Sequence, residues 1–253
     1  MFWTKRARKN IATILITLLP SSAMAEQIIV KSGGPSAASY PPGKKLPTTA
    51  TIALKIGDVL TILDGKGTRT LRGPGSFNMS TTSSSSADTR TSLTSLLTTN
   101  RARRARTGAV RNVSGSETSK ISRSPNLWFV DISQSTTACV NDLTNIQLWR
   151  PDQAQPLKVK ISDVKTGAST FINYQKNQSL AIWQTGSLSP QDGASYAFSW
   201  AGLTKPVAIR VVTMGSNVEG LESTASALIT KGCEAQLNLL VETVAQPDSA
   251  NER

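Results

Sequence analysis

The chain of 253 residues contains no histidine. Ser-His-Asp sites, Cys-His sites and His-ligated zinc are therefore excluded. The sequence also shows no nucleophile elbow, no phosphate-binding glycine loop and no metal-ligand spacing. Carboxylates remain as acid–base groups, but most stand beside turn residues, where Asp commonly bonds its own backbone. We therefore expect a protein that is not an enzyme and needs no cofactor or metal; the carboxylates considered are Asp131, Asp142, Asp163, Asp192 and the helix glutamates.

Cysteine is nearly absent as well, because the sequence has only Cys139 and Cys233. In an oxidising compartment a pair of this kind most often forms a structural disulfide. Two separately buried thiols are the alternative. We expect the disulfide.

The sequence has no hydrophobic run long enough to span a membrane, and its longest N-terminal run covers only residues 11–19. This is about half of the ~20 residues that a spanning helix needs. Four basic residues precede the run, and Ala23-Met24-Ala25 follows it. This order is typical of a cleavable signal peptide over residues 1–25, so we expect a secreted, periplasmic protein that begins at Glu26. An uncleaved anchor is the alternative.

Composition and charge divide the remaining chain into a module (26–77), a linker rich in Ser, Thr and Arg (78–126), a second folded region (127–244) and a polar tail (245–253). The module has seven basic and three acidic residues, and the linker has eight and two. From residue 127 onward there are nine basic and eleven acidic residues. The excess positive charge therefore belongs to the N-terminal half.

The module reads as short strands over residues 51–56, 59–63 and 68–72. Asp64-Gly65 is a hairpin signal, because glycine tolerates positive φ. Gly73-Pro74-Gly75 ends the third strand.

The stretch from Leu54 to Leu71 resembles the FecR-type extracytoplasmic β module, in which Gly-Asp, an apolar strand, Asp-Gly and a returning strand recur. The resemblance covers about fifty residues. FecR proteins carry a cytoplasmic anti-sigma segment and a membrane span before this module, and this sequence shows neither. The resemblance therefore implies a periplasmic scaffold or sensing role, and not direct control of a sigma factor.

In the linker, Leu93, Leu96 and Leu97 lie at helical spacing and a group of arginines follows them. The segment reads either as a short amphipathic helix that lies on an anionic membrane or glycan surface, or as a solvated tether. No aromatic residues interleave the basic ones, so nucleic acid is not an expected partner. The candidate surface contacts are Arg101, Arg103, Arg104, Arg106 and Arg111.

The second folded region reads as short strands separated by turns, which is typical of an immunoglobulin-like β-sandwich. Four tryptophans fall in these strands, and core packing is their commoner fate, with a recognition face as the alternative. From Leu221 the period becomes helical and breaks at Gly232, which predicts one or two helices packed on the sandwich. The expected strands are 127–132, 137–140, 146–149, 157–162, 170–174, 180–183, 196–200 and 207–214.

The sequence as a whole predicts a mainly β, non-catalytic interaction, scaffold or sensing protein of the bacterial cell envelope, with a protein partner in that envelope. The alternative is an envelope-binding module that contacts peptidoglycan or anionic glycan through the basic linker and exposed aromatic residues.

Overall fold

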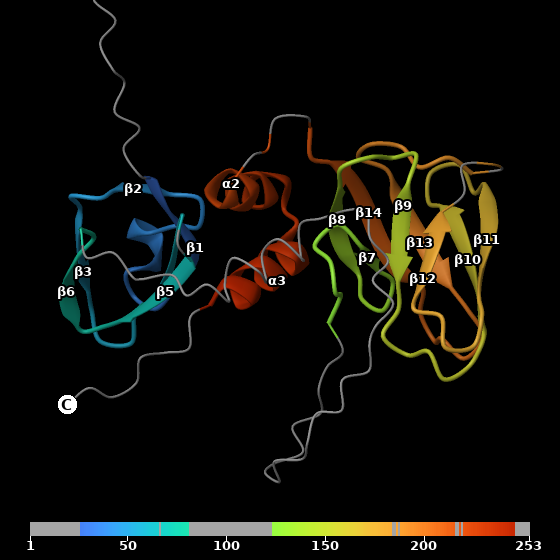
Figure 1. Cartoon of the computed structure of the whole chain (residues 1–253), viewed down its shortest axis with the longest axis horizontal. Coiled ribbons are helices and arrows are strands. Elements are labelled where there is room, and N and C mark those ends of the chain that lie inside the picture. Colours follow the sequence, from blue (N-terminus) through green and yellow to red (C-terminus); the bar gives the residue numbers. More distant parts are fainter. Residues whose placement is uncertain are drawn as a thin grey trace, which may run out of the picture.

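A computed structural model describes residues 26–65, 67–80, 123–183, 186, 188–215, 218 and 220–245. In these residues the protein is mainly β, with two helices near the C-terminus. Figure 1 shows three parts side by side: an N-terminal β region, the helix pair in the middle, and the C-terminal sheets.

The N-terminal region contains a four-stranded antiparallel sheet and a two-stranded one. The predicted hairpin across Asp64-Gly65 is confirmed, because β4 and β5 pair from Val59↔Arg72 to Asp64↔Gly67. The sequence patterns did not single out β1, β2 or β6, and the strand expected over 51–56 ends at Leu54. The four-stranded sheet has the order β2-β1-β4-β5, and its strands are β1 Glu26–Gly33, β2 Lys45–Pro47, β4 Val59–Asp64 and β5 Gly67–Arg72. The second sheet pairs β3, Thr51–Leu54, with β6, Gly75–Asn78. Residues Ala37–Ser39 form a 3-10 turn.

Strands β1 and β4 are covered on both faces. Ile29 and Ile62 face the small core shared with β3 and β6, while Ile28 and Leu63 face the helices. A strand with two covered faces carries a continuous apolar run instead of an alternating one. This explains why the Ile-Ile-Val sequence of β1 gives no period-2 signal.

The C-terminal region has a five-stranded sheet of order β11-β10-β13-β14-β8 and a three-stranded sheet of order β12-β9-β7. The two sheets share one core, to which the inner faces of both contribute buried residues. The pairs β14–β8 and β7–β9 are parallel, and the other pairs are antiparallel. The strands are β7 Val130–Asp131, β8 Thr136–Val140, β9 Ile146–Trp149, β10 Leu157–Asp163, β11 Ser169–Tyr174, β12 Leu180–Trp183, β13 Ser195–Ser199 and β14 Val207–Thr213.

The helices are α2, Leu221–Lys231, and α3, Glu234–Val244. Gly232 separates them with a left-handed φ of 72°, and the N–H of Cys233 donates to the carbonyl of Leu228. This is a common C-terminal glycine arrangement, and it ends α2 where the sequence predicted a break. Neither helix of the described residues has the length and apolar character needed to cross a bilayer.

The helix pair packs against both β regions, as Figure 1 shows. The prediction placed the helices on the C-terminal strands, and in the structure they also cover Ile28, Val30 and Leu63 of the N-terminal sheet. Residues of both helices share one buried cluster with Ile28, Val30 and Leu63 of the N-terminal sheet and with Cys139 of the C-terminal one, so their apolar faces lie between the two β regions.

Candidate functional site

The joint between α3 and β8 contains the predicted disulfide. Cys139 of β8 and Cys233 at the start of α3 are bonded, with their Cα atoms 5.9 Å apart. Both cysteines are fully buried. The disulfide therefore fastens the helix pair to the edge of the five-stranded sheet.

A buried glutamine completes this joint. The side-chain amide of Gln236 donates to the carbonyl oxygens of Cys139 (2.7 Å) and Leu127 (2.6 Å). Its Oε1 accepts the backbone N–H of Cys139 at 2.6 Å. Sequence patterns did not find Gln236, because a single glutamine in a helical period carries no signal of the strand that it will meet.

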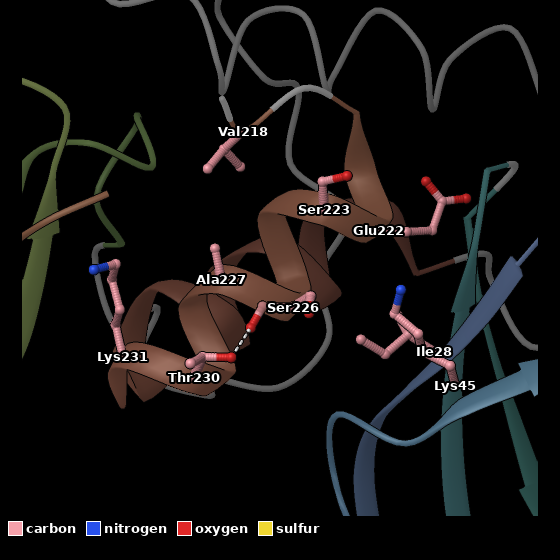
Figure 2. Close-up of a pocket in the computed structure, with 9 residues that line it drawn as sticks. All are labelled: Ile28, Lys45, Val218, Glu222, Ser223, Ser226, Ala227, Thr230 and Lys231. Atoms are coloured by element: carbon pink, nitrogen blue, oxygen red, sulfur yellow. Dashed lines mark hydrogen bonds between the residues drawn. The ribbon is translucent and has the colours of Figure 1, made fainter. Parts of the chain in front are cut away.

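A groove of about 400 Å³ lies between α2 and the strands β1 and β2. Figure 2 shows that one face of α2 lines it with small side chains, while Ile28 and Lys45 lie across from the helix. The hydroxyl of Thr230 donates to the carbonyl of Ser226 at 2.8 Å. The lining residues are Ile28, Lys45, Val218, Glu222, Ser223, Ser226, Ala227, Thr230 and Lys231.

The groove offers hydroxyl groups from α2 and charges of both signs. Lys45 and Glu222 lie near one end in Figure 2, and Lys231 lies at the other. Its chemistry suits weak polar contacts, and most of the side chains with which α2 lines it are small. We assign no ligand to it.

Five carboxylates of the C-terminal sheets accept backbone N–H groups. Asp131, Asp142 and Asp152 each bond the N–H two residues later in the chain. Asp163 accepts from Lys165 and Thr166, and Asp192 accepts from Thr213 at 2.7 Å. These are the turn and loop roles expected for such aspartates.

The hydrogen bonds lower the pKa of three of these carboxyl groups. The backbone N–H of Thr144 lowers the pKa of Asp142, and that of Thr166 lowers the pKa of Asp163. The N–H of Thr213 does the same to the pKa of Asp192. Within the described ranges no group of three or more His, Cys, Asp or Glu side chains is placed to hold a metal ion.

Asp58 has the same kind of role at a buried position in the N-terminal region. Its carboxylate accepts the N–H of Ser36 at 2.8 Å and the N–H of Lys55 at 2.6 Å. Hydrogen bonding from Ser36 and then from Lys55 lowers its pKa. Asp58 thus joins the loop before the 3-10 turn at Ala37–Ser39 to the turn before β4.

The four tryptophans that we expected in strands lie inside or against the cores, but Trp128 and Trp200 stand outside the strands, before β7 and after β13. Trp149 and Trp183 are buried, and Trp183 makes edge contacts with the rings of Tyr196 (4.7 Å) and Phe198 (5.8 Å). Trp128 and Trp200 are partly buried. Trp128 packs against the cluster around the helix pair, and Trp200 packs against the core of the C-terminal sheets. Among the described aromatic residues, Phe171 of β11 is the ring with a largely exposed surface, at 54%.

The basic residues predicted as surface contacts lie outside the described residues. These are Arg101, Arg103, Arg104, Arg106 and Arg111. Their proposed role therefore stays a prediction.

These features define a disulfide-bonded, mainly β protein in which a helix pair joins two β regions. Comparison with family models, with curated proteins and with solved structures finds no match to this chain.

Proposed function

We propose that this protein is a non-catalytic interaction or scaffold protein of the bacterial cell envelope, exported to the periplasm and bound there to another envelope protein. The observation that carries the proposal is the helix layer, which packs at once on β1 and β4 and on β8. A protein built in this way presents two β surfaces in a fixed relation, as a scaffold requires. The buried disulfide agrees with an oxidising compartment.

A finer assignment follows the same lines. The N-terminal region is proposed as a FecR-like module, supported by the β4–β5 hairpin across Asp64-Gly65 and by the buried Asp58. The C-terminal region is proposed as an immunoglobulin-like sandwich, supported by two sheets with a shared core.

The test is crosslinking in intact cells, followed by capture of the tagged protein and mass spectrometry. One dominant envelope protein that stays bound at high salt supports the proposal. Diffuse recovery of peptidoglycan or anionic glycan that disappears at high salt contradicts it, because screening removes contacts between exposed charges. That result would favour the envelope-binding alternative. A variant without residues 81–122 shows whether the basic segment is needed for binding to the envelope protein or to the glycan.

A further inference from the structure

Strand β11 is the outer edge of the five-stranded sheet, and it lies at the end of the molecule away from the helices (Figure 1). It pairs with β10 on one side, from Leu157↔Tyr174 to Ser162↔Ser169. Edge strands present a row of backbone groups that another extended chain pairs with readily.

The register shows which backbone groups point outward. The N–H of Asp163 donates to the carbonyl of Ala168, at the hairpin between β10 and β11. In an antiparallel pair, alternate residues turn their N–H and C=O toward the partner. Ala168 turns its carbonyl toward β10, and every second residue after it does the same. The residues between these, Ser169, Phe171 and Asn173, turn their backbone N–H and C=O away from β10.

The side chains around this edge combine an exposed ring with positive charge. Phe171 is 54% exposed in the middle of β11 and is directly paired with Lys160. The Nζ of Lys158 lies 4.5 Å from the centroid of its ring. The two lysines lie on the same face of β10, about 7 Å apart along the strand.

Acidic groups do not neutralise these lysines. Among the residues that the structure describes, Lys158 and Lys160 take part in no ion pair. The nearest carboxylate along β10 is that of Asp163, which accepts hydrogen bonds from the N–H groups of Lys165 and Thr166. The edge therefore complements a negatively charged partner.

We propose that β11 is a docking strand for an extended, acidic segment of a partner protein, which adds to the sheet antiparallel or parallel to β11. Its backbone would pair with Ser169, Phe171 and Asn173, and its carboxylates would meet Lys158 and Lys160. Strand addition supplies affinity through the backbone and specificity through alternate side chains. The inference rests on the proposed function, because it names the surface and the chemistry of the protein partner.

Two other occupants fit less well. A second copy that paired edge to edge through β11 would add two more lysines to this face and no carboxylate, so the positive charge of Lys158 and Lys160 would stay unpaired. A glycan would stack on the face of Phe171, but the ammonium of Lys158 already lies over that ring. The outward backbone groups favour a peptide chain.

The first experiment measures the binding of three probes to the purified, oxidised protein by calorimetry. The probes are an eight-residue peptide of alternating Val and Glu, the matching Val–Lys peptide, and a soluble polyuronate. We expect the Val–Glu peptide alone to bind. We also expect K158E/K160E to weaken its binding about tenfold or more. K31E/K55E, which changes the same charge on the N-terminal region, is the matched control and should bind as the natural protein does.

Asn173→Pro gives a second, independent test. Proline removes an outward N–H without touching a bond to β10, so it should block strand addition while the melting temperature stays close to that of the natural protein. Equal binding of the Val–Lys peptide, equal binding of the polyuronate, or no binding of the Val–Glu peptide overturns the inference. Self-association of K158E/K160E without peptide binding also overturns it, because the lysines would then only guard the edge.

Crosslinking in cells separates this inference from the function on which it rests. If K158E/K160E recovers the same partner in full yield, the scaffold function stands and β11 is not its contact surface. If the natural protein recovers no protein partner, the proposed function fails. We expect the natural protein and K31E/K55E to recover the partner, and K158E/K160E to lose most of it.

Discussion

Gln236 of α3 bonds both backbone groups of Cys139, the residue that is itself joined to Cys233 three residues before Gln236. The amide side chain thus takes the place that a neighbouring strand would occupy at the edge of β8. An edge that is paired in this way has no free backbone groups at that residue to recruit another chain. The same sheet is thus covered at Cys139 of its β8 edge, while its other edge is β11.

The first prediction concerns this amide. Gln236→Ala leaves the buried N–H and C=O of Cys139 without this partner, and each such loss costs about 1–3 kcal/mol. We expect the free energy of unfolding to fall by at least about 2 kcal/mol, as measured by urea denaturation of the oxidised protein. Asn238→Ala, at an exposed position of the same helix, is the control and should change it by less than about 0.5 kcal/mol. Equal effects of the two substitutions would show that the amide has no special role.

The second prediction concerns the disulfide. Replacing both cysteines by alanine should lower the free energy of unfolding by about 2–5 kcal/mol, because the bond constrains the unfolded chain. The measurement is denaturation of the natural protein, with and without reductant, beside the double variant. An unchanged midpoint after complete reduction contradicts the prediction. In the double variant, Gln236→Ala should cost less than in the natural protein, because the two contacts hold the same joint.

The parts of the fold that sequence patterns predicted are those with local signals. The strands with alternating residues, the Asp64-Gly65 hairpin and the helix break at Gly232 each depend on residues close together in the chain. The disulfide was also predictable, since only two cysteines are present.

The parts that were not predicted depend on contacts distant in sequence. Strand β1 has a continuous apolar run because sheets and helices cover both of its faces, and nothing local distinguishes this from other apolar runs. The placement of α2 and α3 against two β regions, and the amide of Gln236 at β8, arise only from the folded arrangement. The edge at β11 is likewise a property of strand order, which the sequence does not carry.

The third prediction concerns pH. Hydrogen bonds from Ser36 and Lys55 hold the pKa of Asp58 below its value in the unfolded chain, near 3.8. The stabilisation by the carboxylate is therefore complete above that unfolded value and is lost as the pH falls through the lower, folded value. We expect Asp58→Asn to reduce the stability at pH 7 and to flatten its fall between pH 5 and acid, because the variant has no charge to lose. Thermal melts at a series of pH values test this.

Asp152→Asn is the control for that series, because Asp152 is exposed and accepts the N–H of Ala154, two residues later in the chain. It should follow the natural protein over the whole range. A variant at Asp58 that kept the full acid dependence would assign the dependence to other carboxylates, such as Asp142, Asp163 and Asp192.

The last prediction tests whether the helix pair couples the two β regions. Leu60 and Leu63 are both buried in β4, but Leu60 faces the core shared with β3 and β6, while Leu63 faces the helices. Replacing either by alanine should cost about 2–5 kcal/mol. Only Leu63→Ala should raise the hydrogen exchange of the amides in α2 and α3, because it removes a contact between the N-terminal sheet and the helices. Equal protection of the helices in both variants would mean that the N-terminal region does not stabilise them, and that the C-terminal sheets and the disulfide hold the helix pair alone.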